Sequence, residues 1–181
     1  MAISGSWLFS PVSLADSRGL LLEAFSARTF REATGTSLEL AQVNLSVSKM
    51  GVIRGIHFTG RTPGQAKYVM CVQGQIRDVV VDLRPDSNTF GHWDSAVLDD
   101  LERQAVFIEA GLGHAFQVLS ESATVVYITS MPYDPDNEFS ISPLDPGLDL
   151  PWDLSLPRRL SARDSVAPSF KDFFGDSRTR I

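Results

Sequence analysis

The sequence predicts an all-β fold, an antiparallel sandwich or barrel, and two observations support this. Segments rich in β-branched residues recur about every ten residues. Gly, Pro, Asp, Asn and Ser separate these segments. Such spacing is typical of antiparallel sheets that close into a sandwich or barrel, and it differs from the spacing of βαβ units. We expect one or two short helices beside the sheets.

Local composition defines the elements in chain order. A helix is predicted over residues 27–34, because Ser26 can cap its first turn. The predicted strands cover residues 38–48, 68–72, 76–83, 105–108 and 123–129. The glycines between them are expected at turns or at close approaches of the backbone.

The C-terminal part has a different composition. Seven of the ten prolines lie between Pro132 and Pro168, which predicts extended chain and turns that wrap the barrel. We therefore expect one domain over residues 1–181, with a core of about 16–130, a wrap over 131–170 and a polar tail over 171–181.

Composition also restricts the class of protein. The net charge of −6 and pI of about 5.0 argue against a broad basic surface for nucleic acid. No apolar run approaches the roughly 20 residues that span a bilayer, and no signal peptide is visible, so we expect a cytoplasmic protein that binds no membrane. Cys71 is the only cysteine, which excludes an intrachain disulfide and predicts a buried small side chain.

Two of the three histidines are candidates for chemistry. His57 and His114 lie beside glycines in apolar, strand-like segments, whereas His92 lies in a turn-like segment. Each of the first two is either a hydrogen-bonded core histidine or a functional one. A common metal-ligand pattern in β-barrels is a His-x-His pair followed by a Glu. Here Thr59 occupies the second position after His57 and no Glu follows before Gly74, so a metal site is not expected.

Proton chemistry is the alternative role. His57 is a candidate general base, since its side chain titrates near neutral pH and is commonly held by a carboxylate. The candidate carboxylates are Asp78, Asp82, Asp94 and Asp164, and spacing does not choose among them. Lys67 is either an edge lysine that limits aggregation or a cation that stabilises a developing oxyanion. Tyr133, between prolines, is either a rim aromatic or a phenolic acid.

Five motifs in order resemble one family. They are RGIHF, the run GQAKYVMCVQGQIRDVVVDLRPDSNTFGHW, AGLGHAF, Tyr133-x-Pro and LSARD. Together they resemble the dTDP-4-dehydrorhamnose 3,5-epimerase family over residues 16–168. The segments PGQAKYV and GLGHAF are most similar to the corresponding segments of family members from antibiotic deoxysugar pathways. The resemblance implies a cupin jelly roll, a double-stranded β-helix, that works as a homodimer without a cofactor.

The resemblance also implies roles for individual residues. His57 matches the catalytic base, Asp164 the carboxylate that pairs with it, and Lys67 the lysine near the ketone oxygen. Tyr133 matches the tyrosine that donates a proton on the opposite face of the sugar. The positions that match substrate-binding residues are Arg18, Glu23, Phe25, Gln42, Asn44, Arg54, His114 and Arg163. In relatives, the segment containing Arg18, Glu23 and Phe25 reaches the nucleotide partly from a partner subunit.

The chemistry of these residue types agrees with the implied activity. A 4-ketone acidifies the C–H bonds on both neighbouring carbons, and inversion needs a base on one face and an acid on the other. Some positions depart from the family pattern: QVNLSVS stands where relatives often read QDNHSxS, and Pro132 precedes Tyr133 where they often have tyrosine. The motifs do not separate epimerisation at C3, at C5 or at both. A ketoisomerase on the same barrel, and a metal-dependent or non-catalytic cupin, are the alternatives.

Overall fold

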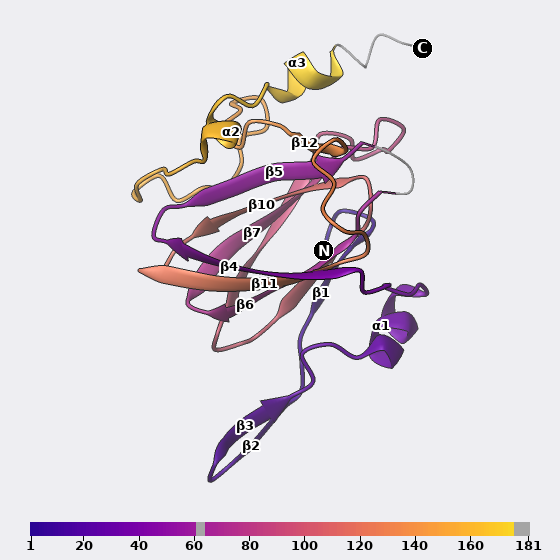
Figure 1. The fold of residues 1–181 in the computed structure, drawn as a ribbon, viewed down its shortest axis with the longest axis vertical. Helices are drawn as coiled ribbons and strands as arrows, with labels where there is room; N and C mark the ends of the chain where they lie inside the picture. Colours follow the sequence, from indigo (N-terminus) through magenta and orange to yellow (C-terminus); the bar gives the residue numbers. More distant parts are fainter. Residues whose placement is uncertain (61–63, 176–181) are drawn as a thin grey trace.

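The protein folds as two facing antiparallel sheets. The structure is a computed structural model, and it describes residues 1–60 and 64–175. Sheet I has the strand order β1-β9-β6-β11-β4, and sheet II has the order β12-β5-β10-β7-β8 (Figure 1). A separate two-stranded hairpin, β2-β3, projects away from both sheets. The predicted all-β jelly roll is confirmed.

The strands of sheet I are β1 (Ser6–Phe9), β9 (Ala105–Ile108), β6 (Lys67–Gln73), β11 (Ser122–Thr129) and β4 (Gln42–Lys49). Those of sheet II are β12 (Glu138–Ser140), β5 (Ile53–Thr59), β10 (Leu112–Val118), β7 (Gln75–Asp82) and β8 (Trp93–Asp99). The hairpin consists of β2 (Ser13–Asp16) and β3 (Gly19–Leu22). Residues 38–41, expected as strand, precede β4 without strand structure.

Three short helices occur in residues 1–60 and 64–175, where one or two were expected. They are α1 (Ala27–Thr34), α2 (Ala162–Ser165) and α3 (Phe170–Phe174). The bounds of α1 match the prediction, since the Ser26 hydroxyl caps Thr29 and Gly35 ends the helix at φ 73°. Ser161 and Ser169 cap the other two helices in the same way. Residues 171–174, expected in a polar tail, therefore belong to α3, and residues 176–181 lie outside the described part.

The main core lies between the two sheets. Val69 and Cys71 of sheet I pack there with Ile76, Val80 and Phe116 of sheet II. The burial of Cys71 agrees with the prediction for that residue. Residues pointing into this space alternate with residues on the outer faces, as the two-residue period of a strand requires. The inner faces therefore supply both the core and the wall of any pocket between the sheets.

The outer faces of the two sheets are covered differently. The segment after Pro132 crosses sheet II and buries Leu148, Leu150 and Trp152 against it (Figure 1). Within this segment, the Trp152 Nε1–H donates a hydrogen bond to the Pro143 carbonyl at 2.7 Å, which holds its two parts together. Sheet I is covered by α1 and an aromatic cluster around Phe30 and Tyr68. None of the helices described is long and apolar enough to cross a membrane.

Candidate active site

A polar pocket of about 220 Å³ opens between the inner faces of the two sheets. Its lining includes seven of the predicted site residues: Gln42, Asn44, Arg54, His57, Lys67, His114 and Tyr133. These residues are far apart in the sequence and come from β4, β5, β6, β10 and the segment before β12. The sandwich thus brings most of the predicted site together.

His57 is paired with Asp164 at the wall of this pocket. The distance between His57 Nε2 and Asp164 Oδ1 is 2.7 Å. The imidazole retains 26% of its side-chain exposure, whereas the carboxylate retains 3%. Asp164 lies in α2, where the Ser161 hydroxyl accepts a hydrogen bond from its backbone N–H at 3.0 Å. Of the four carboxylates considered for His57, the structure places Asp164 against it.

The pKa of the Asp164 carboxyl reflects two opposed effects. Burial by itself would raise this pKa, because it disfavours the charged form. The hydrogen bond and charge of His57, together with hydrogen bonds from Ser161 and from the Gly55 backbone, lower the pKa by more, so it lies below its usual value. Asp164 is therefore an anion at neutral pH, suited to hold the imidazole in one orientation and to stabilise its protonated form.

Gly55 allows β5 to approach β10 closely beside this pair. Its φ is +111°, and a Cβ at this position would lie 2.3 Å from the His114 carbonyl oxygen. Glycine is the residue that fits such a contact and such a dihedral angle. The prediction of a close backbone approach is confirmed here, and this approach places His57 and His114 opposite each other as cross-strand partners.

His114 forms a second pair with a different carboxylate. The distance between its Nε2 and Asp78 Oδ2 is 2.7 Å, and the side-chain exposures are 9% and 0%. Asp78 was a candidate partner of His57, and the structure assigns it to His114 instead. Its other oxygen, Oδ1, is buried and has no hydrogen-bond partner among the described residues.

Lys67 is buried at the first position of β6. The alternative of an aggregation-limiting edge lysine is wrong, because β6 lies between β9 and β11 in the interior of sheet I. Burial lowers the pKa of Lys67 below its usual value. The carboxylates of Glu138 and Asp78 act against this shift, whereas Arg163 adds to it. The positive charge of a lysine in such surroundings interacts strongly with nearby charges, because most water is excluded.

Tyr133 lies at the mouth of the pocket, with just over half of its surface exposed. Its backbone N–H donates to Gln42 Oε1 at 2.9 Å, and Gln42 Nε2 donates to Asn44 Oδ1 at 2.6 Å. This chain of hydrogen bonds ties the segment that carries Tyr133 to β4. Arg54 of β5 also contacts β4, because its Nε donates to Ser48 Oγ at 3.1 Å.

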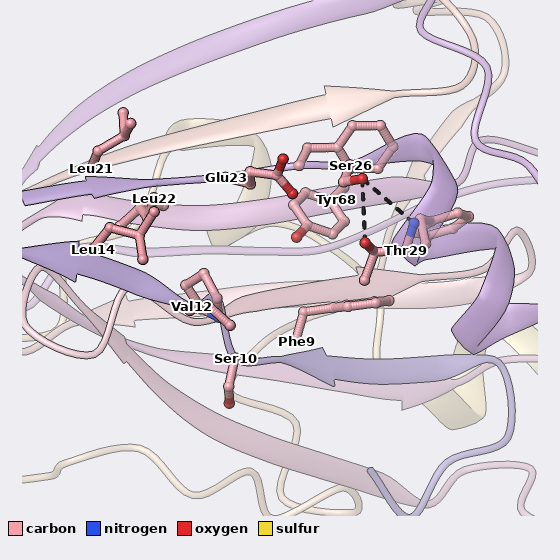
Figure 2. A pocket seen from close by; sticks show the side chains of 13 residues that line it. Phe9, Ser10, Val12, Leu14, Leu21, Leu22, Glu23, Ser26, Thr29 and Tyr68 are labelled. Carbon is pink, nitrogen blue, oxygen red and sulfur yellow. Dashed lines mark hydrogen bonds between the residues drawn. The ribbon is translucent and has the colours of Figure 1, made fainter.

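Five predicted residues do not line this pocket, and one of them, Asp164, contacts it through His57. Arg18 lies in the projecting hairpin and is highly exposed. Glu23 and Phe25 line a separate, mostly apolar pocket of about 420 Å³ between that hairpin and α1. Figure 2 shows Glu23 there among Leu14, Leu22 and Tyr68. Arg163 of α2 donates to the side chain of Glu138 at 3.2 Å and to its backbone carbonyl at 2.8 Å.

The structure adds pocket residues that were not predicted from the sequence. They are Gln65, Phe116, Tyr127 and Glu138. The alternation along β11 places Tyr127 on the inner face, which a strand pattern can reveal. Glu138 lies in a proline-rich segment without a period, so nothing in its sequence context indicated it. Among residues 1–60 and 64–175, no three His, Cys, Asp or Glu side chains form a group that could hold a metal ion.

Comparisons with known proteins identify related enzymes. The family described as dTDP-4-dehydrorhamnose 3,5-epimerase matches residues 1–172. A dTDP-4-dehydrorhamnose 3,5-epimerase of Mycobacterium tuberculosis is 46% identical over 172 residues, covering 94% of this chain and 85% of that protein. NovW, a 4-keto-6-deoxy sugar epimerase from the novobiocin cluster of Streptomyces spheroides, is 46% identical with a TM-score of 0.92, covering 95% and 86% of the two chains. ChmJ, a 3'-monoepimerase of Streptomyces bikiniensis solved with dTDP-quinovose, is 44% identical with a TM-score of 0.92, covering 97% and 89%.

Proposed function

The chain belongs to the dTDP-4-dehydrorhamnose 3,5-epimerase family, and we propose that its pocket inverts C3, C5 or both in a dTDP-4-keto-6-deoxyhexose. The protein is an isomerase, an epimerase of dTDP-sugars. Relatives from antibiotic gene clusters are among its homologues. The observation that supports a role for this pocket most strongly is the His57–Asp164 pair beside a buried lysine.

His57 is the general base in this proposal. It removes the proton on the carbon next to the ketone, and the bonding electrons move into the enolate. The partly exposed imidazole can reach a sugar in the pocket, while its Nε2 remains on Asp164. As the imidazole becomes positively charged, the buried carboxylate stabilises it. Asp164 thus both orients the base and favours the proton transfer.

Lys67 stabilises the enolate oxygen. The negative charge that leaves the carbon appears on the former ketone oxygen, and a fixed cation in a water-poor site stabilises such charge most effectively. His114 lines the same pocket and can supply a further hydrogen bond. Neither group needs to gain or lose a proton for the enolate to form.

Tyr133 returns a proton to the opposite face of the same carbon. Inversion requires an acid placed across the sugar from the base, and the phenol at the pocket mouth has the required chemistry. Donation gives a phenolate, which recovers its proton from solvent, and His57 releases its proton to solvent. The two faces of the reaction are then served by groups from different segments, β5 and the segment before β12.

Arg54, Gln42 and Asn44 bind the nucleotide sugar. A guanidinium matches the geometry of a diphosphate, and the two amides supply neutral donors and acceptors. All three side chains line the pocket, and Gln42 accepts a hydrogen bond from the Tyr133 backbone. An acidic protein can therefore hold an anionic substrate through a local cluster of suitable groups.

The enzyme works as a homodimer in this proposal, with residues 1–181 as one domain. The outer face of edge strand β4 exposes Val43, Leu45 and Val47, and Leu45 retains 65% of its surface. An exposed apolar edge strand is a pairing surface. In this proposal Arg18, Glu23 and Phe25, which lie outside the His57 pocket, serve the site of the second copy. Light scattering after gel filtration tests this: a dimer is expected, with Leu45→Glu shifting it towards monomer.

Proton NMR in D₂O tests the proposed reaction. With dTDP-4-keto-6-deoxyglucose and the protein, the C3 signal, the C5 signal or both should disappear as solvent deuterium replaces the proton. The pattern of loss identifies the carbons that are enolised. The matched control is dTDP-glucose, which lacks the ketone and should keep every carbon-bound proton. Retention of both signals in the keto sugar would refute the proposal.

A further inference from the structure

Lys67 needs a negative charge close by if it is to act as the enolate-stabilising cation, a role that rests on the proposed function above. The lysine is buried in the interior of sheet I, and burial disfavours its ammonium form. A neutral amine would be a much weaker partner for an oxyanion than an ammonium group. The charges around Lys67 therefore decide how well the pocket stabilises the enolate.

The charged and titratable groups around Lys67 come from six helices and strands and from the segment before β12. Those that line the pocket with it are His57 and Arg54 of β5, His114 of β10, Tyr127 of β11, Glu138 of β12, and Tyr133. Asp78 of β7 and Arg163 of α2 act on it electrostatically. Asp78 is already bound to His114, and Asp164 is bound to His57. Glu138 is thus the pocket carboxylate, among the described residues, that neither histidine engages.

Glu138 is held in place by two independent contacts. It begins β12, which pairs with β5 so that Glu138 lies opposite Thr59, two residues from His57. From α2, Arg163 Nη1 forms an ion pair with Glu138 Oε2 at 3.2 Å, and Arg163 Nη2 donates to the Glu138 backbone carbonyl at 2.8 Å. Its side chain keeps 16% of its exposure, so solvent screens its charge weakly.

We propose that Glu138, clamped by Arg163, is a positioning residue that keeps the Lys67 ammonium charged in the pocket. In this proposal Arg163 acts through Glu138, a role that differs from the substrate-binding role implied by the family resemblance. The carboxylate lies among the groups facing Lys67, and the guanidinium points at the carboxylate. Glu138 therefore contributes to transition-state stabilisation without touching the reacting carbon.

The scarcity of lysine makes a direct titration possible. Lys49, Lys67 and Lys171 are the only lysines, so the double variant Lys49→Arg, Lys171→Arg leaves Lys67 as the single lysine signal. Its ¹³Cε shift can be followed against pH in the full chain without substrate. In this background Glu138→Gln should lower the Lys67 midpoint by about one pH unit, because it removes a nearby opposite charge. Glu138→Asp, which keeps the charge, should restore most of this shift.

The matched control is Glu121→Gln, which removes the same charge from an exposed position that is not among those acting on Lys67. It should leave the midpoint unchanged. Glu138→Ala provides a second neutral variant if the glutamine variant unfolds, and it should show the same downward shift. A Lys67 midpoint that is the same in wild type and in the folded neutral variants would overturn the proposal.

A kinetic measurement connects this titration to the reaction. The alkaline limb of kcat/KM for substrate C–H exchange should move to lower pH in Glu138→Gln by the same amount as the Lys67 midpoint, with activity on the acid side retained. An equal loss at every pH would contradict the proposal. If wild type exchanges no proton of the keto sugar, the proposed function fails, and the substrate-free titration still decides whether Glu138 controls the charge of Lys67.

Discussion

Two histidine–carboxylate pairs lie side by side in this molecule, and they differ in burial. His57–Asp164 and His114–Asp78 have the same 2.7 Å separation, and the two histidines are cross-strand partners on β5 and β10. The His57 imidazole keeps 26% of its exposure, whereas His114 keeps 9%. A base must reach its substrate and exchange its proton with solvent, so burial separates the two pairs where hydrogen-bond length does not.

The two carboxylates, Asp164 and Asp78, also differ in where they lie and in how fully they are enclosed. Asp164 sits on a short helix of the C-terminal segment, packed over β5. Asp78 is wholly enclosed on β7, an interior strand of sheet II, and one of its oxygens has no partner among the described residues. The more exposed pair is therefore better placed to exchange a proton with substrate and solvent, and the enclosed pair is better placed to hold a hydrogen-bond donor.

Replacing each histidine in turn should give the largest difference in activity between the two pairs. His57→Asn should lower the epimerisation rate by about 10³-fold, since it removes the general base. His114→Asn should lower it by about 10-fold, since Lys67 remains to stabilise the enolate. Steady-state rates with dTDP-4-keto-6-deoxyglucose measure both. Equal losses in the two variants would mean that the difference in burial has no functional meaning.

Removing the Asp164 charge in Asp164→Asn should reduce the epimerisation rate by about 10²-fold through its effect on His57.

Asp164→Asn should also change how the stability of the protein depends on pH. Because the pKa of Asp164 is lower in the folded protein, its stabilising contribution is complete above the usual value of 3.8 and is lost as the pH falls below it. Urea unfolding should therefore show the wild type more stable than the variant at pH 7, by about 2 kcal/mol. A gap that stays constant down to pH 2 would contradict this account.

Asp78→Asn should affect stability more than chemistry. It replaces one member of a buried, hydrogen-bonded pair, which costs about 3 kcal/mol when the partner is left uncompensated. The epimerisation rate of the folded variant should fall by less than that of Asp164→Asn. Thermal unfolding and rates measured on the same preparation test this order. The reverse order would assign the catalytic role to the buried pair.

Tyr133→Phe should have the smallest effect on the first step. Removal of the phenol leaves His57 and Asp164 intact, so the C–H signal of the substrate should still be lost in D₂O at close to the wild-type rate. Inversion should slow about 10-fold, because the acid on the opposite face is missing. Chromatography of the products measures inversion separately. Wild-type inversion in this variant would leave Tyr133 as a rim residue.

Parts of this structure that depend on neighbouring residues were predictable from sequence. Helix α1 is bounded by Ser26 and Gly35, whose capping chemistry is local. Strand β9 has the bounds that its apolar run predicts. Strand β10 was harder to delimit, because Gly111 and Gly113 look like turn residues, and the close packing of Gly113 against Ile56 and Leu83 becomes visible only in the folded protein.

Features that depend on long-range contacts were not predictable from local pattern. The partner of His57 lies 107 residues away, and spacing alone left four carboxylates open. The edge-strand alternative for Lys67 failed because strand order is set by the whole sheet. Glu138 was missed, since its place in the pocket depends on how β12 pairs with β5. For Tyr127, alternation along the strand indicates the inner face, but its place beside this pocket depends on how β11 pairs with β6. The family resemblance supplied Asp164 through its motif, which local chemistry could not do.

Deuterium wash-in by the His57→Asn variant tests the central claim most directly. The variant is first shown to be folded and to bind dTDP by calorimetry, and it is then mixed with dTDP-4-keto-6-deoxyglucose in D₂O. We predict that the C3 and C5 proton signals persist in the variant under conditions in which the wild type removes at least one of them. Loss of either signal at the wild-type rate would show that another group abstracts the proton, and that the partly exposed His57–Asp164 pair is not the base of this enzyme.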